Sequence, residues 1–215
     1  MIPSVVRAWR TRRKVARLLS ARAQIKLEIG AGGLAGEGGW TTLDLSSGAD
    51  LFWDLRKPLP FPDDSVAAVY SSHVLEHFRY KDLVRLLREC SRILKPGGTF
   101  SVSVPDASIY VRGYLDAGGF NRGKFLAYAP AVLSDCRMDI INYIAYMDGH
   151  HRYMFDAENL TAVLARAGFV RVSAREFDPA RDPEARRYES IYAIAFKPGG
   201  AQHAAETPVA DRVGK

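Results

Sequence analysis

The stretch Ile25-Lys26-Leu27-Glu28-Ile29-Gly30-Ala31-Gly32-Gly33 decides the fold that we expect for this 215-residue chain. Three apolar residues alternate with Lys26 and Glu28, and glycines follow directly. Alternation with a period of two is typical of a β-strand, and glycines allow a ligand to approach the backbone closely. In an open α/β sheet, ligands bind beyond the carboxyl ends of the strands. The stretch therefore predicts a first strand whose end forms part of a binding site.

The chain beyond this stretch continues as alternating strands and helices. Further strands are predicted over 40–45, 49–54, 66–71, 99–104, 169–174 and 190–196. A helix is predicted over 81–94, where Lys95-Pro96-Gly97-Gly98 ends it. A later helix is expected after Asp156, which stands at its N-cap position, with Gly168 just past its end. We therefore predict an α/β fold with a single doubly wound, mostly parallel, seven-stranded sheet.

Two segments depart from this regular alternation. Residues 106–150 contain scattered aromatic residues without a clear period, and we expect them to form a lid inserted after strand five, helical around 136–147. Residues 1–22 contain seven basic residues and no acidic residue. We expect an amphipathic helix over 4–22, with one apolar side formed by Val5, Trp9, Ala16 and Leu19. The domain itself is predicted over 23–197, followed by a disordered tail over 198–215.

The composition favours a soluble globular protein, with 47% hydrophobic and 25% charged residues. The two cysteines, Cys90 and Cys136, indicate no disulfide framework. The N-terminus lacks the apolar core of a secretory signal, so a cytoplasmic location is expected. A basic helix with a tryptophan is also compatible with peripheral contact to an anionic membrane, although packing of the helix on the domain explains the pattern too. No motif predicts nucleic-acid binding, and the oligomeric state is left open.

Five motifs in this order resemble the class I S-adenosylmethionine (SAM)-dependent methyltransferases. They are Leu27–Gly32, Asp44, Asp54-Leu55, Ser71–His77 and Leu94–Gly98, and the resemblance covers roughly residues 25–197. It is strongest to a branch often associated with polysaccharide biosynthesis. It implies that SAM is the cofactor and that a methyl group goes to a hydroxyl or amine of a small-molecule or glycan-precursor acceptor.

One feature of the sequence departs from that family. Only nine residues, 31–39, separate the first two expected strands, whereas the family normally has a full helix there. A non-catalytic SAM-binding scaffold is therefore an alternative function.

The resemblance also implies which residues bind the cofactor. Asp44, at the end of strand two, would accept hydrogen bonds from both ribose hydroxyls. Asp54 would contact the adenine amino group and Leu55 would pack on the ring, with Asp50 as a competitor for the role of Asp54. The full cofactor set is Glu28, Gly30, Gly32, Asp44, Leu45, Asp54, Leu55, Ser71 and Ser72.

A nicotinamide-dependent reductase is a less favoured alternative. Gly30-Ala31-Gly32-Gly33-Leu34-Ala35 also fits the dinucleotide pattern G-x-G-x-x-A. The span to the next strand is too short for the crossover helix that this pattern requires, and Glu28 stands where dinucleotide folds more often have an apolar residue. The chain also offers no second substrate domain.

The segment His73-Val74-Leu75-Glu76-His77 has the H-x-x-E-H spacing of some zinc peptidases. It directly follows an expected strand rather than lying inside a long helix, and no later helix offers a clear third ligand. We therefore expect no metal site. If the acceptor is a hydroxyl, a base must take its proton. The candidates are His73, His77, Asp106, His150 and His151.

Overall fold

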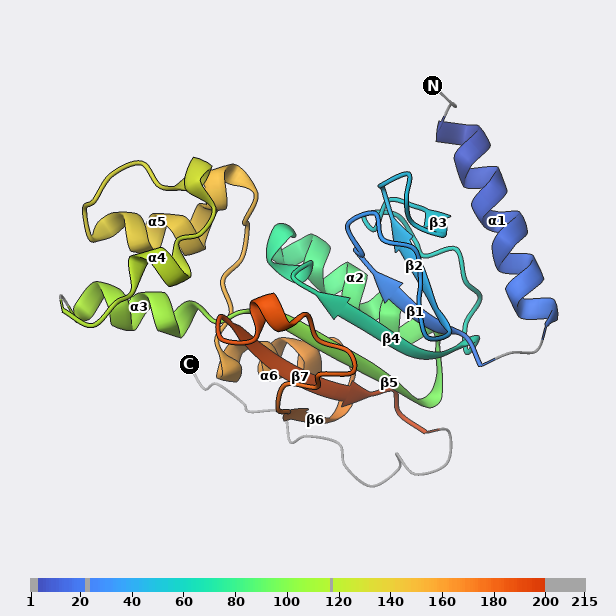
Figure 1. Ribbon diagram of the computed structural model, residues 1–215. Helices are drawn as coiled ribbons and strands as arrows, with labels where there is room; N and C mark the ends of the chain where they lie inside the picture. Colours follow the sequence, from blue (N-terminus) through green and yellow to red (C-terminus); the bar gives the residue numbers. More distant parts are fainter. Residues whose placement is uncertain (1–3, 22–23, 117, 200–215) are drawn as a thin grey trace, which may run out of the picture.

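A computed structural model describes residues 4–21, 24–116 and 118–199 of the chain (Figure 1). Its centre is a seven-stranded sheet with the order β3-β2-β1-β4-β5-β7-β6. The strands are β1 Lys26–Ile29, β2 Trp40–Asp44, β3 Leu51–Phe52, β4 Val66–Ser72, β5 Leu94–Pro105, β6 Val170–Ala174 and β7 Ser190–Phe196. β7 runs antiparallel to both of its neighbours, and the pairs from β3 to β5 are parallel. The predicted mostly parallel, seven-stranded α/β fold is confirmed.

The direction in which the chain winds through the sheet changes at β1. β1 pairs with β2 on one side and with β4 on the other, so the strand order reverses between β1 and β4. Such a switch point leaves a crevice at the carboxyl ends of the two strands, where ligands bind in open α/β sheets. The glycine loop that follows β1 opens into this crevice.

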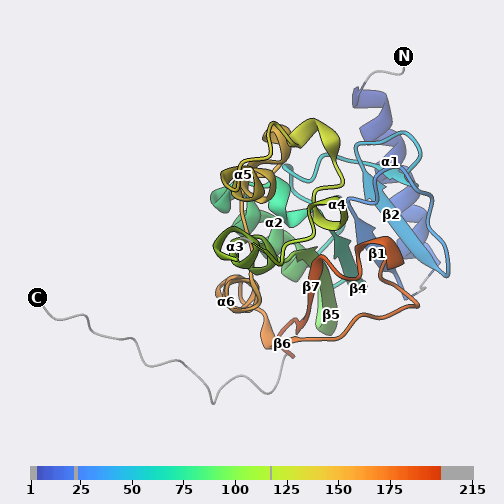
Figure 2. The ribbon, with the colours of Figure 1, turned by 60° about the vertical axis from the view of Figure 1, so that its left-hand side comes forward.

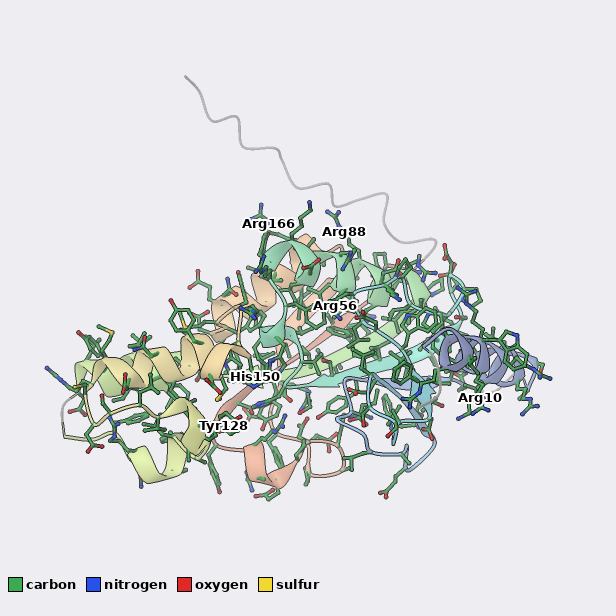
Figure 3. The ribbon with its side chains drawn as sticks, turned by 90° about the horizontal axis from the view of Figure 1, so that it is seen from above. Arg10, Arg56, Arg88, Tyr128, His150 and Arg166 are labelled. Atoms are coloured by element: carbon green, nitrogen blue, oxygen red, sulfur yellow. The ribbon has the colours of Figure 1, made fainter. Side chains whose placement is uncertain are left out.

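Helices α2 (Tyr80–Ile93) and α6 (Ala157–Arg166) cover one face of the sheet. Figure 3 shows Arg88 of α2 and Arg166 of α6 projecting from the same side of the molecule. The apolar face of α2 is fully buried through Leu83, Leu86, Leu87, Cys90 and Ile93. The helical spacing of these residues in the sequence therefore places them in the core.

The N-cap of α6 is formed as the sequence predicts. The Asp156 side chain accepts a hydrogen bond from the backbone N–H of Asn159, at 2.7 Å. Replacing Asp156 with Ala is expected to lower the free energy of unfolding by about 1 kcal/mol, because that N–H loses its acceptor. Thermal or urea unfolding measures the change. Asp156→Asn keeps an acceptor oxygen and is the control, and an equal loss in both variants would contradict the capping role.

The opposite face of the sheet carries a loop in place of the helices of a fully doubly wound fold. The connections over 30–39, 45–50 and 53–65 contain no helix. For the first of them, the short nine-residue spacing after β1 predicts this. Segment 175–189, which includes the short 3-10 helix η4 (Glu184–Arg186), covers this face instead. Tyr70 of β4 donates a hydrogen bond to buried Asp182 at 2.9 Å, and Arg175 forms an ion pair with the same carboxylate. A hydrogen bond and an ion pair to Asp182 thus hold the loop on the face of the sheet that helices would otherwise cover.

The basic N-terminal helix α1 (Ser4–Ser20) packs against the edge of the sheet at β3. Val15 is buried, and buried Thr11 donates a hydrogen bond to the Phe52 carbonyl at 2.9 Å. The predicted apolar side of the helix is wrong for Trp9, which is 55% exposed, and for Ala16, which is exposed as well, whereas Leu19 is partly buried against the core. The face that contacts the sheet instead contains Thr11 and Val15. A threonine can take the place of an apolar residue there because its hydroxyl donates a hydrogen bond to a strand carbonyl. The side chain of Val5 lies outside the described residues.

Residues 106–150 form a small group of helices beside the sheet, which Figure 2 brings forward. They comprise α3 Ala107–Leu115, α4 Arg122–Phe125, α5 Met138–Tyr146 and the 3-10 helices η2 Ala129–Ala131 and η3 Met147–Gly149. The group has its own apolar cluster, in which the rings of Tyr110 and Tyr143 stack with centroids 5.8 Å apart. The insertion is thus more helical than predicted, because its scattered aromatic residues pack against each other rather than against the sheet.

Three expectations concern the chain as a whole. Cys90 and Cys136 are both free thiols, and the sequence predicts no disulfide framework. Among the described residues, no helix has the length and apolar content needed to cross a bilayer. The prediction for the tail over 198–215 falls mainly on residues 200–215, which lie outside the described residues.

Candidate active site

A cavity of about 940 Å³ opens at the carboxyl ends of β1, β2 and β4. Its size lies within the range of small-molecule and cofactor sites, about 300–1,000 Å³. Of the nine residues expected to bind the cofactor, Ser71 alone does not line the cavity. Ser71 is completely buried in β4, where its side chain lies on the opposite side of the strand from Ser72. The other eight are Glu28, Gly30, Gly32, Asp44, Leu45, Asp54, Leu55 and Ser72.

The glycine loop has the backbone conformation that only glycine adopts freely. Gly30 and Gly32 have φ values of +72° and +63°. A Cβ on Gly30 would lie 2.3 Å from the side chain of Val74, so this position is closed to any larger residue. A Cβ on Gly32 would meet nothing within 4 Å, although Gly32 lines the cavity. The space next to Gly32 is therefore available to a ligand.

Asp44 stands at the end of β2 and holds this loop in place. One carboxylate oxygen accepts a hydrogen bond from the Gly32 N–H at 3.2 Å, and the other accepts one from the Ser46 N–H at 2.6 Å. An ionised carboxylate offers about four lone-pair positions, so both oxygens keep the capacity to accept hydrogen bonds from a ligand. Asp44 can thus bind two neighbouring hydroxyls and fix the glycine loop beside them.

Asp54 lines the cavity but is paired with a neighbour in the sequence. Arg56 binds both of its carboxylate oxygens, with distances of 2.9 and 3.0 Å. These hydrogen bonds hold the pKa of Asp54 below its usual range. Asp50, the possible competitor, instead accepts hydrogen bonds from Gly36 and Thr42 and is absent from the cavity lining. Its role is to fix the loop between β1 and β2.

The Arg56 side chain is 65% exposed, so its pair with Asp54 costs little to break. Replacing Arg56 with Ala is expected to change the Kd for SAM by less than about fivefold, because exposed pairs contribute roughly 0–1 kcal/mol. Isothermal titration calorimetry provides the measurement. A loss of binding well beyond that range would show that Arg56 itself contacts the cofactor.

Glu28 of β1 forms part of the cavity wall from within the sheet. Burial raises the pKa of its carboxyl group, and the Arg181 charge opposes that effect. Arg181 lies over the Trp40 ring, 4.1 Å from its centroid. The loop that covers the helix-free face of the sheet thus also supplies a positive charge near the cavity.

The segment after β4 forms the other side of the cavity, and it includes His73 and His77. His73 has a φ of +52°, an uncommon value for a residue with a side chain, and its Nε2 lies 2.7 Å from the Ser190 hydroxyl. Burial, together with the Arg186 charge, lowers the pKa of His73 to about 2. His73 is therefore a neutral imidazole and a weak base.

Glu76 and His77 belong to a short 3-10 helix, η1 (Leu75–His77). The backbone carbonyl of Glu76 accepts hydrogen bonds from the Arg152 and Tyr153 N–H groups. This pairing connects the chain leaving the insertion to the cavity wall. Burial raises the pKa of the Glu76 carboxyl group to about 8. The two histidines of the H-x-x-E-H segment do not share a helix face, so the peptidase arrangement is not formed.

The remaining base candidates do not line the cavity. Asp106 is the N-cap of α3, where it accepts a hydrogen bond from the Ser108 N–H. His150 is exposed at the border of the insertion, with its ring against Tyr128 (Figure 3). His151 is buried behind His77, and its ring contacts the His77 ring edge to face. Of the five candidates, the structure brings only His73 and His77 to the cavity.

Several cavity residues are not predicted from the sequence. They are Ala31, Leu34, Trp53, Arg56, Val74, Phe78, Arg79, Asp82, Arg152, Pro183 and Arg186. Trp53 and Val74 directly neighbour predicted residues, so proximity in the sequence offers a signal for them. Arg152, Pro183 and Arg186 come from later segments that reach the cavity only through the fold. No motif in the sequence marks them.

None of the described residues of the insertion, 106–116 and 118–150, lines the cavity. The predicted lid does not cover the site in this structure, because the insertion is held by its own apolar cluster beside the sheet. It contributes to the site through the chain that leaves it, at Arg152.

The chain matches known proteins over part of its length. A family model described as a methyltransferase domain matches residues 53–102, from just after β3 into β5. A probable SAM-dependent methyltransferase of Mycolicibacterium smegmatis is 42% identical over 55 residues, which are 26% of this chain and 21% of that protein. The chain thus matches about a fifth of the length of that curated relative.

Solved structures share the fold across most of the chain. A complex of the Haloferax volcanii Trm112 methyltransferase activator with a putative methyltransferase gives a TM-score of 0.50 at 18% identity, covering 92% of both chains. A SAM-dependent methyltransferase from Archaeoglobus fulgidus also gives 0.50 at 18% identity, covering 90% of this chain and 93% of that one. Haemonchus contortus phosphoethanolamine N-methyltransferase 2, solved with SAM, gives a TM-score of 0.51 at 13% identity, and the match covers 88% of this chain and 53% of that one.

At these identities the structural likeness shows the fold, and residues 53–102 are similar to a methyltransferase domain. Both findings agree with the resemblance to the class I SAM-dependent methyltransferases.

Proposed function

We propose that the protein transfers a methyl group from SAM to a hydroxyl or amine of a small-molecule or glycan-precursor acceptor. The observation that carries this proposal is the cavity at the switch point, where the glycine loop, Asp44 and Asp54 lie together. Three expected cofactor contacts from three different strand ends meet in one site. Such a coincidence is not required by the fold alone, since connecting loops vary freely.

The cavity offers separate surroundings for the ribose and for the adenine of SAM. Asp44 is placed to accept hydrogen bonds from the ribose hydroxyls, and the open space at Gly32 lets the cofactor approach the backbone. Leu55 and Trp53 give apolar surface for the adenine ring, next to Asp54. The bound sulfonium supplies an already activated methyl group. The protein therefore has mainly to align the acceptor with it.

The acceptor side of the cavity is formed by Ser72, His77, Arg152 and Arg186. Of the two histidines that line the cavity, His77 is the one better placed to contact an acceptor, because His73 Nε2 is paired with Ser190 and its lowered pKa makes His73 a poor base. Arginines beside the cavity favour an acceptor with negative charge, such as a phosphate or carboxylate. Haemonchus contortus phosphoethanolamine N-methyltransferase 2 has been solved with phosphomonomethylethanolamine, a charged small molecule. A glycan precursor that carries a phosphate group would also bring negative charge to the cavity.

A methyl-transfer screen tests the proposal. The purified protein is incubated with SAM that carries a tritiated methyl group and with separate cell-wall, lipid and small-molecule extracts. We expect label to enter one fraction and S-adenosylhomocysteine to accumulate in step with it. Binding of SAM without any transfer would favour the scaffold alternative. Binding of NADH in place of SAM would favour the reductase alternative.

A membrane role would involve the outward side of α1. Val15 of that helix packs on the domain, whereas Trp9, Arg10 and Arg13 are exposed toward solvent. Contact with an anionic bilayer would therefore be electrostatic, with Trp9 as an interfacial anchor. Flotation with phosphatidylserine vesicles should then weaken when Arg10 and Arg13 are replaced by Gln. Unchanged flotation would exclude this contact.

A further inference from the structure

Glu76, His77 and His151 bring one carboxylate and two imidazoles together at the edge of the cavity. Their potential ligand atoms all lie within 4.8 Å of one another. Glu76 Oε1 is 3.9 Å from His77 Nε2, and the centroids of the two imidazole rings are 5.4 Å apart. The fold assembles this cluster from two segments, because the backbone pairing of Glu76 with Arg152 and Tyr153 holds His151 behind His77.

The carboxylate of Glu76 has no role in the structure as it stands. Its side chain is only 2% exposed, and neither oxygen has a hydrogen-bond partner among the described residues. A buried polar group without a partner costs about 1–3 kcal/mol, and more when it is charged. Arg186 influences Glu76 electrostatically but makes no hydrogen bond to it. The two oxygens therefore lack a partner that would offset their burial.

Both histidines are oriented so that their Nε2 atoms are left free. His77 Nδ1 lies 3.0 Å from the His150 carbonyl, and His151 Nδ1 lies 2.8 Å from the Ile144 carbonyl. A carbonyl only accepts, so each Nδ1 must carry the proton, and each Nε2 keeps a lone pair. Metal-binding histidines in proteins usually donate their other ring N–H in this way, which fixes the tautomer and the ring.

We propose that Glu76, His77 and His151 bind one divalent transition-metal ion of the Zn²⁺ type. Two imidazoles and one carboxylate, with one position open, are the ligand set of several catalytic zinc sites. Ligand atoms around a tetrahedral zinc lie roughly 3.3 Å apart, as Zn–N and Zn–O distances near 2.0–2.1 Å require. The three ligand atoms, which all lie within 4.8 Å of one another, would have to move closer together around a bound ion. Imidazole nitrogen selects zinc and similar metals over Mg²⁺ and Ca²⁺.

This ligand set differs from the one that the H-x-x-E-H spacing suggests. His73 is not part of it: its Nε2 is bonded to Ser190, and although its Nδ1 lies 3.7 Å from Glu76 Oε1, His73 does not belong to the group whose ligand atoms all lie within 4.8 Å of one another. The ligand that completes the cluster is His151, which stands far along the chain. His151 reaches the cluster because the segment that leaves the insertion returns to the cavity wall, where Arg152 and Tyr153 pair with the Glu76 carbonyl.

The open position of the metal would face the cavity, because His77 lines the cavity whereas Glu76 and His151 are buried. Its role there rests on the proposed function. A bound metal lowers the pKa of a coordinated O–H group, so the acceptor hydroxyl would release its proton to water. The oxygen would then form a bond to the methyl carbon, and the carbon–sulfur bond would break with its electron pair going to sulfur. This assignment selects an oxygen acceptor over an amine.

The test uses untagged full-length protein stripped with a chelator and then titrated with Co²⁺ and Zn²⁺ alone. We expect one equivalent of Co²⁺ to bind and give the visible bands of tetrahedral cobalt, which Zn²⁺ then displaces. The affinity should fall at least ~100-fold in His77→Ala and Glu76→Gln. His77 is on the surface, so its replacement leaves the fold intact, and circular dichroism checks the buried Glu76 variant.

His150→Ala is the matched control. His150 is the sequence neighbour of His151 and offers the His77 ring only its backbone carbonyl, which alanine retains. This variant should bind Co²⁺ as the wild type does. Absence of binding by the wild type, or binding that persists in both His77→Ala and Glu76→Gln, would overturn the proposal. Calorimetry with SAM on the metal-free protein tests the proposed function separately, since cofactor binding does not need the metal cluster.

Discussion

Replacing Asp44 with Ala is expected to raise the Kd for SAM about 5- to 150-fold, which corresponds to ~1–3 kcal/mol. The reason is the loss of the charged hydrogen bonds that we propose to both ribose hydroxyls, together with the loss of the bonds that hold the Gly32 and Ser46 N–H groups. Because the carboxylate acts both on the ligand and on the loop, its removal combines the two effects. Isothermal titration calorimetry with SAM measures the change.

Two further variants separate these effects. Asp44→Asn keeps an acceptor oxygen for the loop but loses the charge, so its loss of affinity should lie between those of the wild type and Asp44→Ala. Asp135→Ala removes an exposed carboxylate of the insertion, far from the cavity lining, and should leave the Kd unchanged. Wild-type affinity in Asp44→Ala would contradict the assignment of Asp44 to the ribose.

Replacing Gly32 with Ala is expected to lower SAM affinity at least tenfold, because the new methyl group occupies space that the cofactor needs. A Cβ at Gly32 meets no protein atom within 4 Å, so the variant tests the ligand space rather than the packing of the protein. Calorimetry again gives the affinity, and thermal unfolding gives the stability.

Gly38 provides a closely matched control in the same connection. Its φ of +59° resembles the +63° of Gly32, and a Cβ there also meets nothing within 4 Å. Gly38 does not line the cavity. Alanine at either position should therefore cost a similar ~1–2 kcal/mol of stability through its left-handed backbone. Only Gly32→Ala should lose SAM affinity, and equal affinities in the two variants would show that the ligand does not approach this loop.

The sheet and half of the site follow from local sequence signals. The strand endings at Gly30, Asp44 and Asp54 are visible because alternation stops at a glycine or an acid, and parallel strands bring such ends to one edge. The missing full helix after β1 is equally visible, since a nine-residue connection leaves room for a turn or two at most. Ser71 is misassigned because adjacent residues of a strand point to opposite faces, so only one of Ser71 and Ser72 can reach the cavity.

The acceptor side depends on contacts between distant segments and could not be predicted in this way. Arg186 reaches the cavity because segment 175–189 covers the face of the sheet that lacks helices. His151 meets Glu76 only through the pairing of the chain after the insertion with η1. The position of the insertion is set by the packing of its own aromatic residues, which carry no periodic signal.

Titration of the wild-type protein with SAM, S-adenosylhomocysteine and NADH in a calorimeter tests the central claim most directly. That claim is that the cavity between the glycine loop, Asp44 and Asp54 receives the nucleoside part of SAM. The account predicts that SAM and S-adenosylhomocysteine each bind once per chain with micromolar affinity and that NADH gives no binding heat. Binding of NADH, or no heat with either SAM compound, would contradict it.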